Sequence, residues 1–278
     1  MTLVIGGTGK TGRRVVARLQ ARQVPVRVGS RSAPEAPFDW DDPSGWAAAL
    51  DGVTSAYITY HPDLAFPGAA EKIRSFAELA VSLGARRLVL LSGRGEEGAL
   101  HSEEEFKASG ADWTIVRCSF FQQNFGEDFM VDPVRSGVLA LPAGEVPEPF
   151  LDCEDIADVV VAALTDDAHV GRTYELTGPR LLTFGDIAAE LTEAIGRKVI
   201  FVPMSGGDWA AAAVADGVPP ELAQNLVALF AEVLDGRNAH LTDGVQQALG
   251  RPPRDMSDYI RRTAATGVWD TSPGEVGS

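Results

Sequence analysis

The stretch VIGGTGKTGRRV, residues 4–15, decides the fold predicted for this chain. Gly6, Gly9 and Gly12 recur at every third position between an apolar run and the helical pattern RRVVARL. Glycines at a strand-to-helix turn let the backbone approach a phosphate, and the N-terminus of the helix favours its negative charge. The stretch therefore predicts a phosphate-binding turn between a first strand and a first helix.

Two classes of phosphate-binding turn compete for this stretch. The Walker loop of ATPases, G-x-x-x-x-G-K-[ST], is matched at its end by Gly9-Lys10-Thr11, but Val4 stands where its first glycine is required. The spacing Gly6-x-x-Gly9-x-x-Gly12 is instead that of dinucleotide-binding turns, as in short-chain dehydrogenases and their extended relatives. We therefore expect a nicotinamide dinucleotide to be held by Gly6, Thr8, Gly9, Lys10, Thr11 and Gly12.

The end of the second predicted strand, VRVGSRS, indicates which dinucleotide binds. An acidic residue at this point would bind the ribose 2′-hydroxyl of NAD and repel the 2′-phosphate of NADP. The sequence has Arg31 and Ser32 here, and a guanidinium suits a phosphate. NADP is the predicted cofactor, with Arg13 as a further cation beside the site.

The rest of the chain alternates strand and helix patterns as far as about residue 165. Short apolar runs predict a buried parallel sheet with helices between the strands, which is a doubly wound α/β fold of the Rossmann type. The predicted strands cover residues 2–6, 24–29, 53–59, 86–92 and 112–117, with a short one at 38–40.

The domain prediction follows from this alternation. We expect an NADP-binding domain at 1–150, whose sheet continues into part of 151–180, and a smaller, mainly helical substrate lobe at 181–269. The loop near 119–150 should contribute to that lobe, and the polar segment 270–278 should be a disordered tail.

Composition excludes several classes of protein. The 278 residues carry a net charge of −15, which argues against direct binding of nucleic acid. No apolar run reaches the roughly 18 residues of a membrane span, and the N-terminus lacks the layout of a signal peptide. The two cysteines, Cys118 and Cys153, are not spaced as metal ligands, so we expect no metal site and a reduced, cytoplasmic setting.

The chain resembles the NmrA-like branch of the atypical short-chain dehydrogenase/reductase superfamily. Similar proteins include type 2 NAD(P)H:quinone reductases, ergot-alkaloid dehydrogenases that reduce iminium intermediates, and redox-sensing regulators. The segments that carry the resemblance are GGTGKTG, FDWDDP at 38–43, SGADWTIVRCSFFQQNF at 109–125, DIADVVVAAL at 155–164, GRTYELTGP at 171–179 and ALGRPPRDMSDYIRRTA at 248–264.

The resemblance implies roles for further residues. Asp39 would face the adenine amino group, Thr59 and Tyr60 would line the cofactor channel, and Ser92 would lie near the nicotinamide. Ser119, Phe120 and Phe121 would cover the nicotinamide ribose and ring, and Asn124 matches a recurring asparagine of the family. One departure is Cys118, where many relatives carry proline.

The Tyr-x-x-x-Lys dyad, which protonates carbonyls in ordinary members of the superfamily, is absent from the sequence. Four positions after Tyr57, Tyr60, Tyr174 and Tyr259 stand His61, Leu64, Gly178 and Thr263. The remaining candidates for catalysis are His101, because imidazole titrates near neutral pH, together with Tyr60 and Ser92.

Two functions remain open at this point. The first is an NADP-dependent oxidoreductase that transfers hydride to a hydrophobic quinone, enone, carbonyl or imine, because such acceptors need no strong proton donor. The second is a non-catalytic NADP sensor that binds a protein partner. An aromatic substrate pocket favours the first function, and we expect small hydrophobic or aromatic substrates. We expect no membrane contact, and a homodimer is an open possibility. The predicted substrate-binding residues are Phe121, Asn124, Phe125, Met204 and Trp209, with Phe129 beside them.

Overall fold

The computed structural model describes residues 1–33 and 36–271, and in them a six-stranded sheet has the order β2-β1-β3-β4-β5-β7. Every neighbouring pair of strands is parallel. The strands are β1 (Thr2–Ile5), β2 (Val26–Gly29), β3 (Ser55–Ile58), β4 (Arg87–Gly93), β5 (Asp112–Cys118) and β7 (Arg172–Leu176). The predicted doubly wound α/β fold is confirmed.

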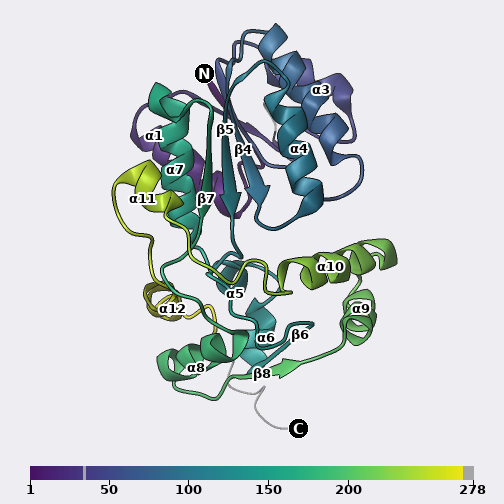
Figure 1. The fold of residues 1–278 in the computed structure, drawn as a ribbon, viewed down its shortest axis with the longest axis vertical. Coiled ribbons are helices and arrows are strands. Elements are labelled where there is room, and N and C mark those ends of the chain that lie inside the picture. The colour runs from purple at the N-terminus through teal and green to yellow at the C-terminus, as the bar shows by residue number, and fades with distance from the viewer. Residues whose placement is uncertain (34–35, 272–278) are drawn as a thin grey trace. The chain divides into compact units, whose positions relative to one another are not determined.

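Helices cover both faces of this sheet, with α1 and α7 on one side and α3 and α4 on the other (Figure 1). Both faces of β1 and β3 are buried, as the continuous apolar runs predict for a parallel sheet. The helical elements of this part are α1 (Lys10–Ala21), η1 (Pro43–Gly45), α2 (Trp46–Ala49), α3 (Ala69–Ser82), α4 (Glu97–Lys107), α7 (Cys153–Thr165), η2 (Asp167–His169) and α11 (Gly244–Leu249).

The chain forms two compact units. The first contains Met1–Cys118, Cys153–Thr177 and Thr242–Pro252, and the second contains Ser119–Asp152, Gly178–Leu241 and Pro253–Ser278. Residues 119–150, which the predicted ranges place with the cofactor domain, thus group with the second unit, as the loosened pattern after residue 118 suggests. Residues 242–252 return to the first unit, where α11 packs against β7 and α7. Most of the predicted disordered tail, residues 272–278, lies outside the described residues.

The second unit is mainly helical, but a short two-stranded parallel sheet pairs β6 with β8. β8 lies inside the segment that was predicted to be mainly helical, and its side chains are mostly exposed, so the usual alternation of a half-buried strand is missing. The elements of this unit are α5 (Asn124–Glu127), α6 (Val131–Ser136), β6 (Val138–Leu141), α8 (Phe184–Ile195), β8 (Ile200–Pro203), α9 (Gly206–Ala215), α10 (Pro220–Val233) and α12 (Met256–Ala264).

The short strand predicted at residues 38–40 is wrong, because the described residues 36–42 form no strand and make a single bridge, Ser30 to Pro37. Phe38 and Trp40 turn into the core instead, where their rings meet at a centroid distance of 5.0 Å. The Phe38 ring also packs edge-on against Phe76 of α3. Aromatic burial therefore determines the path of this segment, and strand pairing does not.

Candidate functional site

The glycine turn after β1 has no room for side chains at two of its positions. Gly6 has a φ of +67°, and a Cβ on Gly6 would lie 2.4 Å from the Thr59 hydroxyl oxygen. A Cβ on Gly12 would lie 2.2 Å from the Gly6 carbonyl oxygen, where neither backbone segment can yield easily. The Gly9 N–H donates to that same carbonyl at 2.9 Å and closes the turn. These contacts fit the cradle that a pyrophosphate requires.

The N-terminus of α1 follows directly on this turn. Its N-cap is Gly9, which has no side chain to cap the amides of the first turn, so these amides suit an anion. Thr11 is buried, and its hydroxyl accepts a hydrogen bond of 3.0 Å from Tyr57 of β3. Burial raises the pKa of Tyr57 well above its ordinary value, so the tyrosine keeps its proton. Thr11 therefore ties α1 to the sheet, while Thr8 is exposed and Lys10 half-buried.

The carboxyl end of β2 exposes Arg31 and Ser32, the two residues predicted to contact a 2′-phosphate. Asp39, the predicted adenine contact, is half-buried, and its side chain accepts the Asp41 N–H at 3.0 Å. Tyr60, predicted as a catalytic candidate, packs against Trp40 with ring centroids 5.0 Å apart. This contact packs the half-buried Tyr60 against the aromatic core of the first unit.

The carboxyl ends of β4 and β5 carry a buried hydrogen-bonded network. Ser92 donates its hydroxyl proton to Glu103 at 2.6 Å, and Glu103 is fully buried on α4. Arg117 of β5 binds both oxygens of the same carboxylate, through Nε at 2.9 Å and Nη2 at 2.6 Å. The hydrogen bond to Glu103 raises the pKa of Arg117. Ser92 therefore presents acceptor lone pairs, and its proton is committed to the carboxylate.

This network continues through Glu175 of β7. Arg117 reaches Glu175 at 3.4 Å, and the buried Arg94 binds it at 2.7 Å, so two arginines face two carboxylates. Arg94, Arg117 and Glu175 are not among the residues predicted from the sequence. An available signal was Arg117 itself, because an arginine inside the apolar strand DWTIVRC needs an acidic partner once buried.

His101, the other catalytic candidate, is exposed on α4, whereas Glu103 on the same helix is fully buried. Cys118 at the end of β5 is a buried free thiol whose pKa burial raises well above its ordinary value. Cys118 is therefore a small core residue, with its thiol in the inert, protonated form.

The second unit contains the remaining predicted site residues. Ser119 is buried, Phe120, Phe121 and Asn124 are half-buried, and so are Met204 and Trp209. The Trp209 and Phe120 rings both pack against Phe230, at 5.2 and 6.5 Å between centroids. This unit therefore brings Phe120 and Trp209 together around one phenylalanine.

Phe125 was predicted to bind substrate, but it has no exposed surface. Its ring lies 5.8 Å from that of Phe150, and the Trp269 side chain donates to its carbonyl at 2.8 Å. Phe125 thus belongs to the aromatic core of the second unit, because a fully enclosed ring cannot form a pocket wall. Phe129, by contrast, is 44% exposed.

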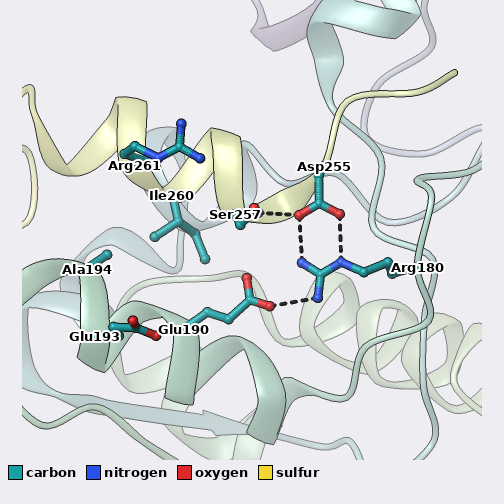
Figure 2. Close-up of a pocket in the computed structure, with 8 residues that line it drawn as sticks. All are labelled: Arg180, Glu190, Glu193, Ala194, Asp255, Ser257, Ile260 and Arg261. Atoms are coloured by element: carbon teal, nitrogen blue, oxygen red, sulfur yellow. Dashed lines mark hydrogen bonds and ion pairs between the residues drawn. The ribbon is translucent and has the colours of Figure 1, made fainter. Parts of the chain in front are cut away.

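A hollow of about 640 Å³ lies in the second unit, and Figure 2 shows the residues around it. Arg180 binds both oxygens of Asp255 at 2.6 Å and one oxygen of Glu190 at 2.9 Å. Ala194 and Ile260 add an apolar wall. The charges around this hollow are largely paired. We therefore assign its ion pairs a structural role, because Arg180 joins the segment before α8 to Asp255 at the start of α12.

The Arg180–Asp255 pair makes stability dependent on pH. The hydrogen bonds from Arg180 lower the pKa of Asp255 to about 2, from an ordinary value of 3.8. A lowered folded-state pKa contributes stability above pH 4 that is lost as the pH falls toward 2. Because the pair is partly exposed, we discount its contribution to about 1 kcal/mol.

We expect R180Q to unfold more easily than the native chain by this amount at pH 6, and the difference to shrink toward pH 2.5. Urea unfolding at both pH values measures it. A difference that stays constant with pH would contradict the prediction.

The comparisons with known proteins identify the family. The pattern of the NAD(P)H-binding family matches residues 6–167, which include the glycine turn and the contacts among Ser92, Glu103 and Arg117. The chain belongs to this family. Among its relatives, the uncharacterized oxidoreductase YesF of Bacillus subtilis is 31% identical, over 96% of this chain and 97% of the relative. The NAD(P)H azoreductase of Xenophilus azovorans is 29% identical over 95% and 98%, and festuclavine synthase II of Penicillium roqueforti is 30% identical over 92% and 96%.

Solved structures show the same fold. The Citrobacter triphenylmethane reductase complexed with NADP(H) aligns with a TM-score of 0.79 at 20% identity, over 94% of this chain and 99% of that one. The quinone oxidoreductase QOR2 of Escherichia coli, complexed with NADPH, aligns with a TM-score of 0.77 at 21% identity, over the same shares. The NmrA-like resemblance is confirmed, because NmrA, a negative transcriptional regulator, aligns with a TM-score of 0.71 at 17% identity over 96% of this chain and 98% of that one. The NAD(P)H-binding family match and the relatives named as oxidoreductases support an NAD(P)H-dependent reductase. Among the helices of residues 1–33 and 36–271, none is long and apolar enough to cross a membrane.

Proposed function

We propose that this protein transfers hydride from NADPH to a flat, hydrophobic electrophile such as a quinone, enone, carbonyl or imine. The observation that carries the proposal is the glycine turn, in which a Cβ on Gly12 would lie 2.2 Å from the Gly6 carbonyl oxygen. Such a turn keeps the backbone open for a pyrophosphate. When bound, NADPH supplies the hydride.

The choice of acceptor follows from the groups that the chain offers. Ser92 commits its proton to Glu103, and the sequence has no tyrosine with a lysine four positions later. An iminium accepts hydride without a proton, and a quinone becomes a stabilised anion that water can protonate. The names of the azoreductase, the triphenylmethane reductase and QOR2 support an extended aromatic acceptor. We propose Phe120, Phe121, Asn124, Met204 and Trp209 as the residues that bind it, and His101 or water as the source of any proton.

The preference for NADPH is proposed to rest on Arg31. A charge-assisted hydrogen bond from its guanidinium to a 2′-phosphate is worth about 1.5–3 kcal/mol. We therefore expect R31A to weaken NADPH binding by about 10- to 100-fold and NADH binding by less than about twofold. Titration of the intrinsic tryptophan fluorescence measures both, and equal losses for the two cofactors would overturn the assignment.

Turnover tests the proposed reaction. Purified protein with NADPH should oxidise the cofactor in the presence of menadione or of a cyclic iminium. The alternative function, an NADP sensor that binds a protein partner, predicts tight NADPH binding with no turnover across the same acceptors. The absent tyrosine–lysine dyad is the observation that favours this second candidate.

A further inference from the structure

Lys72 forms an ion pair with the Asp41 carboxylate in the segment that follows β2 and Arg31. Lys72 of α3 binds Asp41 with its ammonium nitrogen 2.5 Å from the Asp41 Oδ1. This hydrogen bond lowers the pKa of Asp41, and the nearby charge of Arg31 lowers it further. Lys72 stands near the N-terminus of α3, where the helix dipole disfavours positive charge. Helix stability therefore does not explain a lysine at this position.

The same lysine adjoins an aromatic pair next to the glycine turn. The Tyr60 hydroxyl lies near enough to Lys72 to help raise the pKa of that ammonium group, and the Tyr60 ring packs against Trp40. The Trp40 indole N–H donates to the Thr59 carbonyl at 3.0 Å, which fixes the ring beside the residue that touches Gly6. The Lys72–Asp41 ion pair thus lies beside an aromatic pair that is linked through Thr59 to the glycine turn, all within one unit of the chain.

We propose that Lys72 determines cofactor specificity by binding the 2′-phosphate of NADP together with Arg31. Asp41 is the internal anion that pairs with Lys72 until the phosphate displaces it. The inference rests on the proposed use of NADPH and adds to it a second phosphate-binding residue from a different element.

Exchange of the Asp41 carboxylate for the 2′-phosphate favours NADP over NAD for two reasons. The Asp41 side chain is 84% exposed and carries a single charge, so its ion pair with Lys72 is weak and water readily solvates the released carboxylate. A phosphate monoester carries nearly two charges and three acceptor oxygens, enough for both cations. NAD has an uncharged hydroxyl at this position, which cannot replace the carboxylate beside Lys72.

Two adenine nucleotides isolate this subsite from the rest of the cofactor. The probe 2′,5′-ADP carries the 2′-phosphate and 5′-AMP does not, and neither contains nicotinamide. We expect K72Q to weaken binding of 2′,5′-ADP by about tenfold, and that of 5′-AMP by less than about twofold, as the loss of one charge-assisted hydrogen bond predicts. K72R should retain most of the affinity, and D41N should strengthen 2′,5′-ADP binding by about threefold, because the competing charge is removed.

R74Q is the matched control. Arg74 is exposed on the same helix and pairs with Glu78 and Glu105, so R74Q removes one positive charge away from Asp41. Calorimetric titration should show less than about a twofold change for R74Q with either nucleotide. Equal effects of K72Q on both nucleotides, no effect of K72Q, or weaker 2′,5′-ADP binding in D41N would each overturn the role of Lys72. Equal binding of the two nucleotides by the native chain would instead overturn the preference for NADP, whatever the variants do.

Discussion

Replacing Glu103 with alanine is expected to lower the free energy of unfolding by about 3 kcal/mol, because it leaves the Arg117 guanidinium without its main partner. Glu103 is fully buried, and it accepts hydrogen bonds from Ser92 and from two nitrogens of Arg117. Urea unfolding monitored by circular dichroism measures the loss. The cause is electrostatic and steric at once, since E103A removes a buried charge and opens a space beside it.

Two further variants separate these causes. E104A alters the neighbouring residue on the same helix, whose side chain is 71% exposed and pairs with Lys107, and it should change stability by less than about 0.5 kcal/mol. E103Q keeps the shape and an acceptor for Ser92 but removes the charge, so it should lose less than E103A and more than E104A. If E103A were no more destabilising than E104A, the network would not have the structural role assigned to it.

Replacing Gly12 with alanine is expected to weaken NADPH binding on the order of 100-fold, which corresponds to about 2.7 kcal/mol. The new Cβ would lie 2.2 Å from the Gly6 carbonyl oxygen and 2.8 Å from the Gly7 Cα. The turn has to move apart from α1, and crowding of this kind also costs about 1–3 kcal/mol of stability. Fluorescence titration with NADPH, at a temperature where the variant remains folded, measures the effect on binding.

G45A is the control for this substitution. A Cβ on Gly45 would lie 3.6 Å from the Pro37 carbonyl oxygen, which is an ordinary contact in the same unit. NADPH binding by G45A should match that of the native chain within about twofold. NADPH affinity in G12A as high as in G45A would show that the turn does not hold the cofactor.

The fold could be predicted from the sequence because its signals are local. A buried apolar run followed by Gly6, Gly9 and Gly12 specifies a strand, a turn and a helix without any knowledge of distant residues. The same reasoning failed at Phe38 and Trp40, where packing against distant aromatic rings such as Phe76 overrides local strand propensity.

The candidate site could be predicted in part, for the same reason. Arg31 follows the carboxyl end of β2, which in a dinucleotide-binding fold lies beside the adenosine ribose. Its position could therefore be predicted from the sequence. The network that begins at Ser92 could not, because Glu103, Arg117 and Glu175 come from three elements that only the folded sheet brings together. Lys72 likewise meets Asp41 across 31 residues of sequence. Such pairs have no periodic signature, and only their side-chain geometry reveals them.

Deuteride transfer from NADPH labelled at C4 to a cyclic iminium tests the central claim most directly. The iminium carbon keeps a transferred deuterium, whereas a deuterium placed on a quinone oxygen would exchange with water. Mass spectrometry of the amine product should find one deuterium per molecule when the label occupies the transferred position at C4, and none when it occupies the other. Tight NADPH binding with no labelled amine from either form, and no oxidation of NADPH by any quinone or iminium, would contradict the account and identify the protein as a sensor.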